Sequence, residues 1–217
     1  MTKAALRRGG HMRSLWRYKI DCEDIIFMRY HNITKDDMLN GDGLRVVLWV
    51  AGCNHCCREC HNPITWDPDG GLPFDDNARA EIYEQLDKSY ISGITFSGGD
   101  PLHPANRLDV RGLMAEIKER YPDKTIWLYT GDSWENIHQY PLMQYVDVLV
   151  DGEFHVEEKD AKLLWKGSRN QRVIDVKKTI QQKDPKVPVL HCPDYSSPKD
   201  APEPRPAASA AVTACVL

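Results

Sequence analysis

The chain of 217 residues lacks a long apolar run, an excess of positive charge and an internal repeat. No segment approaches the ~18 consecutive apolar residues of a membrane-spanning helix, so no span is predicted. Lys and Arg (28) are fewer than Asp and Glu (32), and a formal net charge of −4 gives no electrostatic basis for nucleic-acid binding. The basic residues Lys3, Arg7 and Arg8 precede a Gly-Gly-His sequence instead of an apolar segment, so no secretory signal is predicted.

Cysteine, in contrast, is present seven times. In the absence of a secretory signal, this favours a reducing compartment, where clustered thiols are more often metal ligands than disulfides. We therefore expect a cytoplasmic protein.

The two ends of the chain differ in composition from its centre. Seven of the fourteen prolines lie between residue 183 and the end, among many Ala and Ser residues. Such a segment buries too little apolar surface to offset its ordering entropy, so 183–217 is predicted to be a disordered tail. Residues 1–27 show no periodicity and are predicted to be a poorly ordered extension. The single folded domain is expected over 28–182.

Between these ends, apolar strand patterns alternate with helical ones. Alternating strands and helices are typical of βα units, whose strands form a parallel sheet with right-handed crossovers. The predicted class is therefore α/β, with the sheet curled into an open, partial (βα) barrel. Ser133 is a plausible N-cap for an additional short helix. The expected strands are 44–51, 93–97, 125–129, 145–150 and 172–176, and the expected longer helices are 75–86 and 106–120.

Four unusual segments directly follow predicted strands. Because parallel α/β sheets build their sites at the carboxyl ends of the strands, these segments are expected to share one site. Any one of them could be an ordinary turn, but four at one edge favour a functional site. They are 53–60, with its four cysteines, and the sequences Ser-Gly-Gly-Asp-Pro at 97–101, Thr-Gly-Asp at 130–132 and Asp-Gly-Glu at 151–153.

The cysteine segment reads Cys-Asn-His-Cys-Cys-Arg-Glu-Cys from 53 to 60. Near neighbours rarely meet the geometry of a disulfide. Structural zinc usually takes two ligand pairs from separate segments, and a ferredoxin-type cluster needs a fourth cysteine at a defined place. The spacing Cys53-x3-Cys57-x2-Cys60 suits three ligands on a four-iron cluster with one open iron. Cys56 is left over, although it could replace Cys57 as a ligand.

This spacing, together with the glycine pair at 98–99, resembles the radical S-adenosylmethionine enzymes. More narrowly, the chain is similar to the activating proteins of anaerobic (class III) ribonucleoside-triphosphate reductases. The resemblance covers about 28 to 176. Supporting strings are Arg-Tyr-His at 29–31, Asn-Gly-Asp-Gly at 40–43, Asn-Pro-Ile-Thr-Trp at 62–66, Phe-Ser-Gly-Gly-Asp-Pro-Leu-His-Pro at 96–104, Tyr-Thr-Gly at 129–131, Val-Asp-Gly at 150–152 and Trp-Lys-Gly-Ser-Arg-Asn-Gln-Arg-Val-Ile at 165–174.

The resemblance implies a [4Fe–4S] cluster on Cys53, Cys57 and Cys60, with S-adenosylmethionine bound at the fourth iron. Reductive cleavage of that cofactor would give a 5′-deoxyadenosyl radical, which would take a hydrogen from a glycine of the reductase large subunit. An external one-electron donor such as a flavodoxin is also implied. The residues expected to line the cofactor are Glu59, Cys60, His61, Gly98, Gly99 and Asp100, with Thr130, Gly131 and Asp151 added by their place at the sheet edge.

Three alternatives stay open at this point. His55 and His61 could ligate iron, although a histidine within a cysteine motif more often forms hydrogen bonds. The enzyme could instead be another small radical S-adenosylmethionine protein, such as an activase of pyruvate formate-lyase or a deazaguanine-forming synthase. A non-catalytic zinc-binding protein is the third possibility, and metal analysis would distinguish it.

Overall fold

The computed structural model describes residues 28–192. The predicted N-terminal extension and residues 193–217 of the predicted tail lie outside the described residues. The first ten residues assigned to that tail are described, and they contact the sheet. The backbone N–H of Asp175 donates to the carbonyl of Val189 (2.8 Å), and that of His191 donates to Val173 (2.8 Å).

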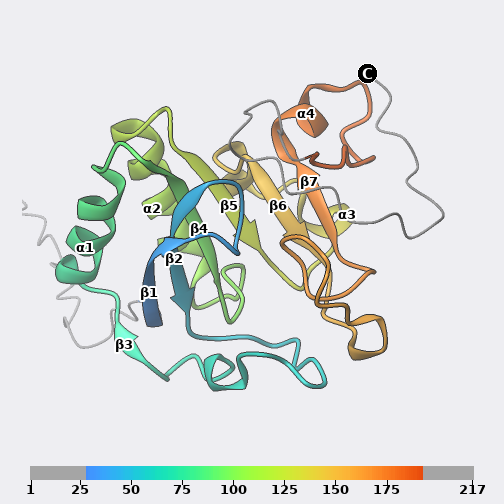
Figure 1. Ribbon diagram of the computed structural model, residues 1–217, viewed down its shortest axis with the longest axis horizontal. Coiled ribbons are helices and arrows are strands. Elements are labelled where there is room, and N and C mark those ends of the chain that lie inside the picture. The colour runs from blue at the N-terminus through green and yellow to red at the C-terminus, as the bar shows by residue number, and fades with distance from the viewer. Residues whose placement is uncertain (1–27, 193–217) are drawn as a thin grey trace, which may run out of the picture.

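A seven-stranded sheet runs through the described domain in the order β3-β1-β2-β4-β5-β6-β7 (Figure 1). The four central strands β2, β4, β5 and β6 are mutually parallel, as predicted. β1 pairs antiparallel with β2, and β7 pairs antiparallel with β6. The bounds are β1 Arg29–Asp37, β2 Leu44–Val50, β3 Leu72–Pro73, β4 Ile91–Gly98, β5 Thr125–Tyr129, β6 Val148–Asp151 and β7 Arg172–Asp175.

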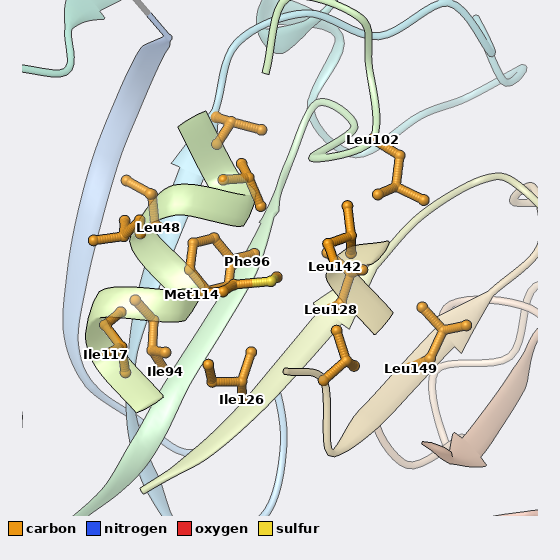
Figure 2. Close-up of a cluster of buried hydrophobic side chains, with 14 of the residues drawn as sticks. Leu48, Ile94, Phe96, Leu102, Met114, Ile117, Ile126, Leu128, Leu142 and Leu149 are labelled. Atoms are coloured by element: carbon orange, nitrogen blue, oxygen red, sulfur yellow. The ribbon is translucent and has the colours of Figure 1, made fainter. Parts of the chain in front are cut away.

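The helices and the sheet share one large apolar core, part of which Figure 2 shows. Alternate residues of the parallel strands enter it, among them Ile94 and Phe96 of β4, because successive side chains of a strand point to opposite faces. Met114 and Ile117, three residues apart on α2, pack against them. The helices are α1 Asp76–Leu86, α2 Arg107–Arg120, α3 Trp134–Ile137 and α4 Val176–Gln181, with 3₁₀ turns Pro63–Thr65, Pro141–Gln144 and Val156–Glu158.

The opposite face of the sheet carries a smaller cluster built on Trp127, Val148 and Val150. Arg45 of β2 is fully buried. It donates five hydrogen bonds to backbone carbonyls and to the hydroxyls of Thr95 and Thr125. Arg45 therefore links β2 to β4 and β5, at the end of the sheet remote from the cysteine loop.

The prediction of an α/β fold with a parallel sheet of βα units is confirmed. The helices predicted at 75–86 and 106–120 are α1 and α2, each shorter by its first residue. The last predicted strand is present but antiparallel, and β1 is an addition to the expected set. Ser133 stands at the N-cap of α3 without a side-chain hydrogen bond; the Asp151 carboxylate accepts from the backbone N–H of Trp134 instead (2.8 Å).

Candidate metal centre and cofactor site

The cysteine loop, residues 53–60, begins three residues after the end of β2 and is fixed at its base by backbone hydrogen bonds. The N–H of Gly52 donates to Thr65 (2.8 Å), and that of Cys53 donates to Trp66 (3.1 Å). The N–H of Asp100 in turn donates to the carbonyl of Gly52 (2.7 Å). The turn after β4 is therefore bonded directly to the start of the cysteine loop.

Backbone N–H groups lie near the sulfurs of the three predicted ligands. Those of His55 and Cys56 lower the pKa of Cys53, and that of Phe154 lowers the pKa of Cys57, against the larger effect of burial. The sulfur of Cys60 accepts from Asn62 at 3.4 Å. N–H donors of this kind stabilise thiolates and tune iron–sulfur clusters.

Cys56 has a different environment from the other three cysteines. Its side chain is exposed, whereas the others are half-buried, and its φ of 50° is in the left-handed region. Exposure and backbone conformation thus set Cys56 apart from the other three cysteines. The ligand set Cys53, Cys57 and Cys60 stays a prediction.

Burial governs the acidity of these thiols in the metal-free protein. Burial raises the pKa of Cys53 to about 11 and also raises the pKa of Cys57. Both are therefore protonated at neutral pH without metal, and a metal ion must displace the protons when it binds.

Asp100 joins three loops at the carboxyl edge of the sheet and is 3% exposed. Its Oδ2 accepts from the His55 ring (2.8 Å), the Thr130 hydroxyl (2.9 Å) and the Gly131 N–H (3.1 Å). Its Oδ1 accepts from the N–H of Leu102 (2.7 Å). All four donors are satisfied by one carboxylate.

Gly98 and Gly99 lie where the turn after β4 passes closest to the cysteine loop. Gly98 has a φ of 111°, which disfavours any side chain. A Cβ at Gly99 would lie 2.5 Å from the carbonyl oxygen of Gly52 and 2.7 Å from that of Thr65. Both glycines are therefore required by the packing of this turn on the loop.

The remaining predicted cofactor residues fall into two groups. Glu59, with a φ of 56°, and His61 are exposed beside Cys60, and the His61 ring faces Phe154 with centroids 5.5 Å apart. Thr130 is buried, and its hydroxyl is engaged with Asp100. The structure thus places the predicted residues at one edge of the sheet, although the side chain of Asp151 there has other partners.

Asp151 is 1% exposed and serves the scaffold. Its carboxylate pairs with Arg172 (2.5 and 3.0 Å) and accepts the N–H of Trp134 at the start of α3. A role in cofactor binding stays a prediction, and these contacts give it no support.

The site also includes Phe154 and Asn106, which no motif indicates, and Glu153, the last residue of the Asp-Gly-Glu segment at 151–153. Glu153 pairs with His55, and Phe154 contacts both Cys57 and His61. Asn106, 1% exposed, donates to the carbonyls of Ala51 and Asp100 (2.7 and 3.0 Å). No spacing within the sequence indicates these contacts, because the partners lie between 6 and 98 residues apart.

The donor set fits an iron–sulfur cluster with three protein ligands. Three half-buried sulfurs lie on one short loop, and backbone N–H groups lie near each of them. The described residues contain no other group of three or more cysteines from which a second cluster could be built.

Comparison with known proteins agrees with this class of site. The family model described as "4Fe-4S single cluster domain" matches residues 39–174, which include the whole cysteine loop. The fold and the site thus define a protein that carries one [4Fe–4S] cluster.

Individual relatives narrow the class. The anaerobic ribonucleoside-triphosphate reductase-activating protein of Enterobacteria phage T4 is 45% identical over 146 residues, which cover 67% of this chain and 93% of that protein. The proteins of the same name from Pasteurella multocida and Escherichia coli K12 are 39% and 40% identical, covering 66% and 67% of this chain and 95% and 97% of theirs. The chain belongs to the family of anaerobic ribonucleoside-triphosphate reductase-activating proteins.

Among residues 28–192, no helix has the length and apolar character needed to cross a membrane.

Proposed function

We propose that this protein activates an anaerobic ribonucleoside-triphosphate reductase by generating a glycyl radical on its large subunit. The observation that carries the proposal is the loop with three half-buried cysteines, bonded at its base to the turn at 98–100, in a chain of this family. The bound [4Fe–4S] cluster would supply the electron that cleaves S-adenosylmethionine.

The chain's own residues would bind the cluster and orient the cofactor. Cys53, Cys57 and Cys60 are proposed to hold the cluster. Gly98 and Gly99 are proposed to accommodate the methionyl end of the cofactor, since both are only partly buried and Gly99 lies against the start of the cysteine loop. The Asp100 carboxylate already accepts four hydrogen bonds, and it would hold this turn and the loop at 130–131 in a fixed relative position.

Glu59 and His61 are proposed to flank the cofactor from the side of Cys60. Both are exposed and next to a proposed ligand. Thr130 and Asp151 would act at a distance, through Asp100 and Arg172 respectively, because their side chains are already engaged there.

The electron would come from outside the chain. One loop of clustered cysteines is present among the described residues, and they offer no second such group. We propose an external one-electron donor such as a flavodoxin. The cytoplasm is the proposed location, because a reducing compartment keeps these thiols available for iron.

The test is anaerobic reconstitution with iron and sulfide, followed by chemical reduction in the presence of S-adenosylmethionine. We expect 5′-deoxyadenosine to form, and to be lost in Cys53→Ala, Cys57→Ala and Cys60→Ala. Cys56→Ala is the matched control and should remain active. Loss in Cys56→Ala with survival of Cys57→Ala would show that the ligand set is wrong.

The second stage adds the partner. With the reductase large subunit present, electron paramagnetic resonance should detect a glycyl radical, and with pyruvate formate-lyase it should not. The opposite result would assign the chain to another glycyl-radical enzyme. Stoichiometric zinc without iron or sulfide would exclude radical chemistry altogether.

A further inference from the structure

His55 is the residue of the cysteine loop with the most extensive contacts outside the loop. Its Nε2 lies 2.8 Å from the carboxylate of Asp100, and its Nδ1 lies 2.9 Å from that of Glu153. These partners follow β4 and β6, 45 and 98 residues along the chain. One side chain thus connects the cysteine loop to two other loops at the carboxyl edge.

The His55 ring is also held by shape. A Cβ placed on Gly131 would lie 2.5 to 2.6 Å from three atoms of the ring. Real Cβ atoms do not approach this closely, so the ring packs against a position where only glycine fits. The loop after β5 is therefore a third contact, in addition to those after β4 and β6.

These contacts decide between the two roles open to His55. A histidine ligates iron through a ring nitrogen that carries no proton. Carboxylates accept hydrogen bonds, so a ring that contacts one at each nitrogen donates from both. Both ring nitrogens are therefore engaged by carboxylates in this arrangement, and the bridge itself is the function to be explained.

We infer that His55 is a positioning residue that holds the cysteine loop at a fixed orientation to the turn at 98–100, and so aligns the cluster with the cofactor. The inference rests on the proposed cluster and cofactor chemistry. Some groups hold metal ligands in place by hydrogen bonds without binding the metal themselves. Removing such a group typically lowers metal affinity or enzyme activity by about 10–100-fold.

The experiment compares His55→Ala and His55→Gln with the wild type after anaerobic reconstitution. His155→Gln is the matched control, because His155 also faces a carboxylate, that of Glu158 at 3.5 Å, but with side chains 50% and 44% exposed. We would measure the iron and sulfide content of each variant, and kcat and KM for cofactor cleavage. A titration would give the S-adenosylmethionine concentration that changes the electron paramagnetic resonance spectrum of the reduced cluster.

We expect His55→Ala to retain the wild-type iron and sulfide content, because the three thiols are intact. The cofactor concentration needed to change the spectrum should rise about tenfold or more, and kcat/KM should fall to match. His55→Gln should recover part of the loss, since its amide can still donate to Asp100. The His155→Gln control should match the wild type.

A second pair of variants tests the packing on Gly131. Gly131→Ala should resemble His55→Ala, because the added methyl group displaces the ring. The double variant should be no worse than His55→Ala alone, because removing the ring leaves room for the methyl group. Full addition of the two effects would overturn the packing argument.

The outcomes separate this inference from the proposed function. If the wild type fails to cleave the cofactor, the proposed function is wrong. If the wild type is active and His55→Ala needs the same S-adenosylmethionine concentration to change the spectrum, only the positioning role is refuted. Loss of iron from His55→Ala would also refute it, because the residue would then serve cluster assembly instead of orientation.

Discussion

Replacing Asp100 with Asn removes one charge and one acceptor from the centre of the site. Asn has nearly the same shape as Asp but only one accepting oxygen. In the better orientation, that oxygen keeps His55, Thr130 and Gly131 as donors, while the new amide group faces the backbone N–H of Leu102 at the former Oδ1 position. The opposite orientation places three donors against the amide and is worse.

The cost follows from these contacts. Leaving the buried N–H of Leu102 unsatisfied costs about 1–3 kcal/mol, and loss of the charge weakens each of the three remaining bonds by up to about 1 kcal/mol. We therefore expect Asp100→Asn to lower the free energy of unfolding of the metal-free protein by between about 1 and 6 kcal/mol.

The assay is urea unfolding followed by circular dichroism, with thiols kept reduced. The exposed Asp123→Asn is the matched control and should stay within about 0.5 kcal/mol of the wild type. A change below about 1 kcal/mol for Asp100→Asn would refute the reasoning, because four donors could not then depend on this carboxylate.

Three further predictions concern the scaffold and are checked by the same unfolding assay. Gly93→Ala should destabilise the protein by about 3 kcal/mol or more, because its Cβ would lie 1.9 Å from a carbonyl oxygen of β5, whereas Gly112→Ala on the open side of α2 should stabilise it by about 0.5–1 kcal/mol. Arg172→Met should cost about 3–5 kcal/mol by leaving the Asp151 carboxylate buried without its cation, and adding Asp151→Asn should recover part of this loss. The hydrogen bond from Arg172 lowers the pKa of Glu135 to about 2, so the small stabilisation that Glu135→Gln removes should be present above about pH 4.5 and shrink as the pH falls towards 2; no change with pH would contradict it.

The central βα units could be predicted because their patterns are local. The apolar run at 125–129 coincides with β5, and the helical spacing at 106–120 differs from α2 by one residue. Strand direction then placed the loops after β2, β4, β5 and β6 at one edge, so the shared location of the site followed from topology.

The antiparallel edges could not be predicted in the same way. β1 is mostly polar, so no apolar run marks it, although it pairs with β2, the next strand along the chain. β7 has an apolar pattern, but that pattern does not show that it pairs antiparallel with β6. Arg45 is another example: within an apolar run it reads as an interruption, yet it is fully buried and donates five hydrogen bonds. Its acceptors come from β4, β5 and the loop before β2, which no local window contains.

The site shows the same division between local and distant information. The spacing of Cys53, Cys57 and Cys60 is visible in the sequence because one short loop must supply all three sulfurs. The direction in which that loop faces is set by His55, through Asp100 and Glu153. A variant can therefore keep the cysteine motif intact and still misalign the cluster. Two relatives with identical cysteine spacing should then differ in cofactor affinity where these bridging contacts differ.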